Sequence, residues 1–129
     1  MLNYLCMCTR PDISVAVSIH SRFLENPGKQ HWKAAKRVLR YLKGTKNYGL
    51  NISPKDSNLS CFSDADWAGN VDNRKSTSGY CVLYGGALVS WKSKLQNCVS
   101  LSTMEFEYYA LSLAAQEVVW FIHKFGYMN

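Results

Sequence analysis

Residues 9–44 carry apolar side chains at the three- and four-residue spacing of α-helices. A first helix is predicted to begin at Thr9-Arg10-Pro11-Asp12, because threonine caps helices and proline favours their first turn. Asn26-Pro27-Gly28 ends this helix. A second helix is predicted from about residue 30 to residue 43. One face of the second helix is apolar and is expected to lie in a core: Trp32, Ala35, Val38, Leu39 and Leu42.

From Tyr48 onward the pattern changes to short segments typical of strands. Residues 49–52 are strand-like, and residues 59–64 alternate between apolar and polar side chains before ending in an acid. Residues 79–84 are rich in strand formers and lead into Gly85-Gly86, a turn after which residues 87–91 form the hairpin partner. These successive strands predict an antiparallel three-stranded meander.

A long amphipathic helix is predicted over Thr103–Phe125. At roughly 100° per residue, one side of it carries a mostly apolar stripe: Glu107, Leu111, Ala114, Val118, Phe121, Ile122 and Phe125. Glu107 is the exception in this stripe, whereas Glu105 falls on the solvent side. A carboxylate that faces a core needs a partner. Asp64 is a plausible neighbour, because it ends a strand of the sheet that this helix must cover.

Two carboxylates brought together repel one another, and a divalent cation relieves the repulsion. Asp64 and Glu107 are therefore candidate catalytic and metal-binding residues. They would bind Mg²⁺, which can position a water and stabilise phosphate charge during strand cleavage. The alternative stays open that Asp64 caps a turn and that Glu107 bonds Ser102 or a backbone amide at the start of its helix.

The positive charge of this 129-residue chain lies in its first third. The net charge is +6, but residues 1–48 hold nine Lys and Arg against two acids, and residues 49–129 hold six against seven. A basic cluster in the second helix is a candidate nucleic-acid-binding face: Lys29, Lys33, Lys36, Arg37, Arg40 and Lys43. The alternative is an ordinary solvated helix face. Trp32 and Tyr41 could stack on nucleic-acid bases beside this cluster, but a place in the core is expected for Trp32. No run of 18 or more apolar residues is present, so no transmembrane helix is predicted.

Ordered motifs along nearly the whole chain resemble those of copia-type retrotransposon Pol polyproteins. Four segments of the chain resemble the ribonuclease H region of these proteins: Ser63-Asp64-Ala65-Asp66-Trp67-Ala68-Gly69, Arg74-Lys75-Ser76-Thr77-Ser78-Gly79-Tyr80, Val89-Ser90-Trp91-Lys92-Ser93-Lys94 and Leu101-Ser102-Thr103-Met104-Glu105-Phe106-Glu107-Tyr108. Two further segments resemble the tail of their reverse transcriptase: Thr9-Arg10-Pro11-Asp12-Ile13 and Arg37-Val38-Leu39-Arg40-Tyr41-Leu42-Lys43-Gly44-Thr45. The resemblance divides the chain into a basic helical segment at residues 1–48 and a truncated ribonuclease H-like domain at residues 49–129.

The resemblance implies an α+β chain with a partial ribonuclease H-like fold: two N-terminal helices, then the three-stranded meander and the long helix. The family's chemistry is Mg²⁺-dependent cleavage of the RNA strand of RNA–DNA hybrids by four acidic residues. Its first Asp matches Asp64 and its Glu matches Glu107. The third and fourth acids have no counterpart before Asn129, so we expect little or no nuclease activity from this chain alone. A Pol product of this kind is expected inside the cell, in the cytoplasm or nucleus.

A second resemblance involves four residues of the basic helix. Arg37-Val38-Leu39-Arg40 has the Arg-x-Leu-Arg pattern of the secreted RxLR effectors of oomycete plant pathogens. It implies secretion, entry into plant host cells, host proteins as partners and suppression of host cell death or immunity. A downstream Glu-Glu-Arg, which such effectors carry, is absent, and the first twenty residues make a poor secretory signal. Whether the chain is a Pol fragment or an effector stays open at this point.

Overall fold

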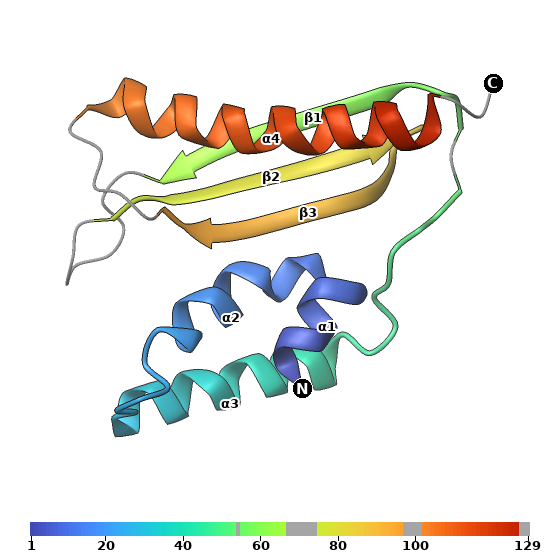
Figure 1. Cartoon of the computed structure of the whole chain (residues 1–129). Coiled ribbons are helices and arrows are strands. Elements are labelled where there is room, and N and C mark those ends of the chain that lie inside the picture. Colours follow the sequence, from blue (N-terminus) through green and yellow to red (C-terminus); the bar gives the residue numbers. More distant parts are fainter. Residues whose placement is uncertain (54, 67–74, 97–101, 127–129) are drawn as a thin grey trace. The chain divides into compact units, whose positions relative to one another are not determined.

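The computed structural model of the chain describes residues 1–53, 55–66, 75–96 and 102–126. The chain divides into two compact units, Met1–Leu50 and Asn51–Asn129 (Figure 1). Within the described residues, the first unit is helical and the second combines strands with a helix. The chain is therefore of the α+β class, as the sequence predicts.

The N-terminal unit begins with a helix that the sequence pattern does not predict. Its elements are α1 (Leu2–Cys8), the short 3-10 helix η1 (Pro11–Ile13), α2 (Ser14–Ser21) and α3 (Lys29–Gly44). The helix α1 is only 7 residues long and has no side-chain cap, so neither periodicity nor capping reveals it. The predicted first helix is split into η1, which starts at Pro11, and α2. The second predicted helix is confirmed as α3.

The core of the N-terminal unit is small and involves a narrow line of α3. The buried residues Cys6, Ile13 and Val38 pack with partly buried Leu2, Leu5, Ala16, Val17 and Leu42. Trp32 is 64% exposed and Leu39 is 46% exposed, so their predicted places in the core are wrong. Trp32 lies six residues before Val38 and therefore about 120° away from it around the helix. The short helices that cover α3 reach only the side that carries Val38 and Leu42.

A polar network around Arg10 joins the two ends of this unit. The Arg10 guanidinium donates to Asp12, with Nε 3.0 Å from Oδ1 and Nη2 2.7 Å from Oδ2. It also donates to the backbone oxygen of Thr45 at 3.1 Å. The Tyr41 hydroxyl donates to Asp12 Oδ2 at 2.9 Å. We call these four residues the Arg10 network, which ties the start of η1 to the end of α3.

The C-terminal unit contains the predicted antiparallel meander. Its strands are β1 (Leu59–Asp66), β2 (Thr77–Tyr84) and β3 (Ala87–Leu95), and the described sheet has the order β1-β2-β3. Gly85 and Gly86 join β2 to β3 with φ values of 56° and 80°, a left-handed conformation that glycine adopts without steric cost. Residues 49–52, although described, form no strand, so that prediction is wrong.

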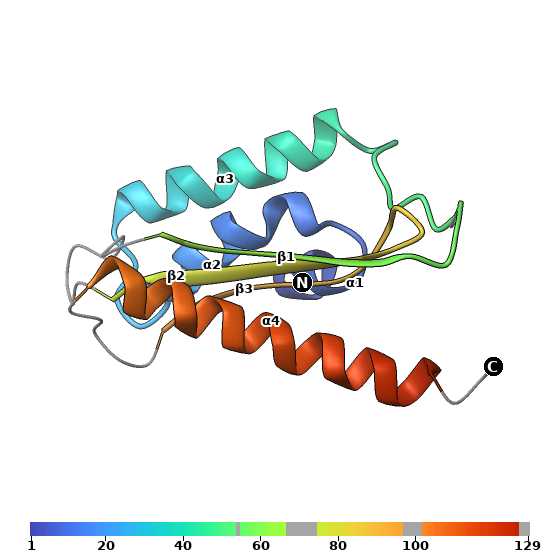
Figure 2. The same cartoon turned by 90° about the horizontal axis from the view of Figure 1, so that it is seen from above.

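The helix α4 (Thr103–Phe125) has the predicted bounds and covers one face of the sheet (Figures 1 and 2). Ser102 caps it by accepting a hydrogen bond from the Glu105 backbone N–H at 3.3 Å. Phe106 and Ala110 of the helix form a buried cluster with Ala65 of β1.

The buried side of α4 differs from the predicted stripe. The fully buried positions are Phe106, Ala110 and Ala114, whereas Leu111 is 55% exposed. Small side chains at residues 110 and 114 let the helix backbone approach the sheet, and Phe106 fills the space beside them. Ala114 belongs to both sets, so the buried side is turned from the predicted stripe by roughly 70°, less than one residue step. Glu107 consequently lies on the flank of the contact and is exposed.

Candidate functional site

The predicted acid of the sheet, Asp64, lies in β1, the outermost strand on one side of the described sheet. Burial alternates along this strand: Ala65 faces α4 and is buried, while Asp64 and Asp66 are exposed. Asp64 pairs with Gly79 of β2, and its Oδ1 accepts a hydrogen bond from the Ala65 backbone N–H at 2.8 Å. Asp64 thus stands inside a strand, and the residues 67–74 that would form a turn after it lie outside the described residues.

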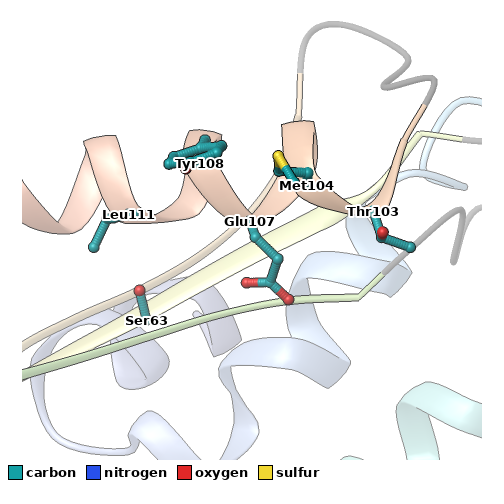
Figure 3. A pocket seen from close by; sticks show the side chains of 6 residues that line it. All are labelled: Ser63, Thr103, Met104, Glu107, Tyr108 and Leu111. Carbon is teal, nitrogen blue, oxygen red and sulfur yellow. The ribbon is translucent and has the colours of Figure 1, made fainter.

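Glu107 extends from α4 toward β1 and lines an open pocket (Figure 3). The other residues that line this pocket are Ser63, Thr103, Met104, Tyr108 and Leu111. Glu107 has no hydrogen-bond or ion-pair partner among the described residues. The alternative that it bonds Ser102 is not what the structure shows, since the Ser102 hydroxyl accepts from Glu105.

Glu107 therefore lies beside β1, the strand that carries Asp64, but the β1 residue that lines its pocket is Ser63 and not Asp64. Ser63 lines the pocket of Glu107, and Asp64 is the next residue along β1, where the side chains alternate between the two faces. Within the described ranges, no group of three or more His, Cys, Asp or Glu residues is placed to hold a metal ion. A metal ion shared by Asp64 and Glu107 stays a prediction.

A carboxylate does reach the interface between α4 and the sheet, but it is that of Glu117. Its Oε1 accepts a hydrogen bond from the Ser90 hydroxyl of β3 at 2.7 Å. Burial, and then the charge of Glu117, raise the pKa of the Tyr80 phenol on β2. The sequence pattern misses Glu117, although it lies three residues after Ala114 and thus on the side that the helix buries.

The predicted basic face is present on α3. Six cationic side chains on this helix are exposed: Lys29, Lys33, Lys36, Arg37, Arg40 and Lys43. No acidic residue lies between Lys29 and Lys46 in the sequence, and none of the six has an ion-pair partner in the part of the chain that is described. We call this set the α3 basic face.

The Arg-x-Leu-Arg residues lie in the middle of the same helix. Val38 is buried in the core of the N-terminal unit, whereas Arg37, Leu39 and Arg40 are exposed. Arg40 Nε donates to the Lys36 backbone oxygen at 3.4 Å. The motif is therefore part of a folded helix whose charged side chains face outward. Among the described helices, none is long and apolar enough to cross a membrane.

Comparison with known proteins identifies the relatives of this chain. No family model matches it, and no solved structure matches it. The retrovirus-related Pol polyprotein from transposon TNT 1-94 of Nicotiana tabacum is 50% identical over 128 residues, which cover 97% of this chain. The Pol polyprotein from transposon RE1 of Arabidopsis thaliana is 44% identical over 92% of this chain. The chain spans 10% and 8% of the length of these two polyproteins.

A short relative matches the same stretch. It is the secreted RxLR effector protein 161 of Plasmopara viticola, which is 52% identical over 120 residues. These residues cover 92% of this chain and 84% of that protein. The polyprotein matches extend along both compact units, as the ordered sequence motifs predict. Over most of its length the chain is therefore homologous to one short segment of retrovirus-related Pol polyproteins from copia-type transposons.

Proposed function

We propose that the chain is a nucleic-acid-binding segment of a retrotransposon Pol polyprotein. It joins the tail of a reverse transcriptase, residues 1–48, to the first half of a ribonuclease H-like domain, residues 49–129. The observation that carries the proposal is the α3 basic face, whose six cations have no acidic partner among the described residues. Such a face neutralises phosphates and releases their counterions, which gives affinity for nucleic acid of any sequence.

The second unit supports the nuclease part of the proposal. The meander followed by α4 is the arrangement that the resemblance to ribonuclease H implies for this half of the domain. Asp64 and Glu107 supply carboxylate oxygens, the ligand type that Mg²⁺ prefers. Because Asp64 follows the pocket residue Ser63 on the alternate face of β1, a shared ion would require its carboxylate to turn toward Glu107. An ion held in that way would polarise phosphate oxygens and activate water. Glu107 fits this role because it is exposed in an open pocket beside β1 and has no described protein partner.

Two carboxylates do not complete the four-acid site that the resemblance implies, so the chain alone is expected to bind nucleic acid without cleaving it. The test is incubation with a labelled RNA–DNA hybrid and Mg²⁺, with Asp64→Asn as the matched control. We expect binding and no cleavage above the level of the variant. Mg²⁺-dependent cleavage that Asp64→Asn abolishes would show that the chain is a complete nuclease. Failure to bind any nucleic acid would overturn the proposal.

A second candidate function is supported by the Plasmopara viticola relative. That protein is named a secreted RxLR effector, and the present chain covers 84% of its length. Arg37, Leu39 and Arg40 are exposed on α3, as a motif read by another protein must be. On this reading the chain is secreted, enters plant host cells and suppresses cell death or immunity through host proteins.

Secretion separates the two candidates. A Pol product is expected to remain inside the producing cell, whereas an effector must leave it. A tagged full-length chain should stay in the cell fraction if the Pol proposal holds. Recovery of the chain from the medium, with an intracellular marker absent there, would favour the effector instead.

A further inference from the structure

Trp32 is a large apolar side chain exposed on the most basic helix of the chain. It is 64% exposed, and it lies on the side of α3 away from Val38 and the core of its unit. The side chains that pack against that core are described, and Trp32 is not among them. Trp32 can therefore contact a ligand without giving up a place in that core.

The surroundings of Trp32 are cationic. Lys29 lies three residues before it and Lys36 four residues after it, so both are its neighbours on the helix surface. The Lys36 ammonium lies over the indole, with Nζ 5.8 Å from the ring centroid. A flat aromatic surface is thus bordered by positive charges along the helix axis.

We propose that Trp32 is a base-stacking residue that makes the α3 basic face prefer single-stranded nucleic acid to duplex. This inference rests on the proposed nucleic-acid binding and adds to it the class of ligand. Aromatic side chains stack on bases of any sequence, while neighbouring cations hold the backbone phosphates. In a duplex the bases are already stacked on one another, so an exposed indole gains nothing from them.

The charge pattern favours a polyanion, and the aromatic ring selects among polyanions. Lysines and arginines alone would attract duplex, single strand and acidic peptide through charge, without needing an indole. An anionic membrane surface would need a broad apolar helix face. On α3, Val38 and Leu42 are used in the core, and the exposed large apolar side chains Trp32, Leu39 and Tyr41 are interspersed with cations. A single strand is the ligand that uses both the phosphate contacts and the ring.

The test compares Trp32→Ala with wild type in the full chain. Fluorescence anisotropy with a labelled 20-nucleotide oligo(U) and with a duplex of the same length gives the two affinities at one salt concentration. Trp32→Ala should weaken oligo(U) binding by on the order of tenfold and leave duplex binding unchanged. Trp32→Phe should restore most of the loss, because a phenyl ring also stacks. Trp120→Ala is the matched control, since Trp120 is 50% exposed on α4.

The outcomes distinguish this inference from the function on which it rests. If Trp32→Ala binds both ligands as wild type does, or weakens both equally, the stacking role is wrong while nucleic-acid binding stands. If the wild type binds no nucleic acid, or binds only vesicles of anionic lipid, both are wrong. Unchanged helicity of the variant by circular dichroism ensures that a loss of affinity is not a loss of folding.

Discussion

Arg10 shows how a nearly buried cation can be accommodated. Its side chain is 9% exposed, and its nitrogens donate to Asp12 and to Thr45. The Arg10 guanidinium holds the pKa of the Asp12 carboxyl below its usual value against the opposing effect of burial, and Tyr41 assists by donating its hydroxyl. The Arg10 network therefore depends on Asp12 being ionised.

That dependence predicts how the N-terminal unit responds to pH. Because the folded pKa of Asp12 is depressed, the network stabilises the unit fully above the unfolded pKa of about 3.9 and loses its contribution as pH falls below that value. Asp12→Asn should lower the thermal midpoint at pH 7, and the difference from wild type should shrink by pH 3. Far-ultraviolet circular dichroism melts at both pH values measure this. An equal difference at pH 3 and pH 7 would show that the Asp12 charge is not what stabilises the unit.

Glu117 is the residue whose position most changes the sequence-based interpretation. The pattern places Glu107 against the sheet, but the carboxylate that bonds β3 is Glu117, through Ser90. Other polar groups share this interface, since Gln96 is buried there and donates to the Ser78 hydroxyl and to the Phe106 backbone oxygen of α4. Tyr80 of β2 lies near the Glu117 carboxylate, whose charge adds to the effect of burial in raising the pKa of the Tyr80 phenol.

We expect Glu117→Gln to lower the pKa of Tyr80 toward its ordinary value. Burial, the larger cause of the shift, persists in the variant, so the pKa should remain above ordinary, but the repulsion between phenolate and carboxylate disappears. Nuclear magnetic resonance of ¹³Cζ-labelled tyrosine follows the titration. Glu107→Gln, on the exposed flank of the same helix, is the control and should leave Tyr80 unchanged. A lower Tyr80 pKa in Glu107→Gln and an unchanged one in Glu117→Gln would place Glu107, and not Glu117, in the interface.

At the scale of the elements, local chemistry is predictable and packing is not. The turn at Gly85-Gly86 and the cap at Ser102 follow from side chains within a few residues, so the hairpin and the start of α4 are predicted correctly. The rotation of α4 about its axis depends instead on which of its faces fits the sheet. Two apolar arcs that share Ala114 exist on this helix, and the one that also contains Phe106 and Ala110 is the one buried.

The orientation of α4 can be tested with two truncations five residues apart. Phe106 is 5% exposed, so Phe106→Ala should cost about 3–5 kcal/mol of unfolding free energy through lost burial and a cavity. Leu111 is 55% exposed, so Leu111→Ala should change it by no more than about 0.5 kcal/mol. Urea unfolding with an unchanged m-value gives both numbers. A larger loss at Leu111 than at Phe106 would restore the predicted stripe.

At the scale of the whole molecule, the charge distribution is the property that sequence reveals best. Lysines and arginines stay exposed unless something pairs with them, so a run without acids predicts a basic face directly, and α3 has one. The same reasoning does not reveal that Trp32 is exposed beside these cations, because aromatic side chains occur both in cores and on surfaces. Its place depends on how few elements cover α3.

The salt dependence of binding tests whether the α3 basic face, and not the overall charge of the chain, makes the phosphate contacts. If all six cations contact a single strand, log K should fall with log salt concentration with a slope of about −4. Replacing Lys33 and Arg40 by alanine should reduce this slope by about 1.4. Replacing Lys92 and Lys94, exposed on β3, removes the same charge from the C-terminal unit and should leave the slope unchanged. Equal effects of the two double variants would mean that binding follows net charge and that α3 is not the contact surface.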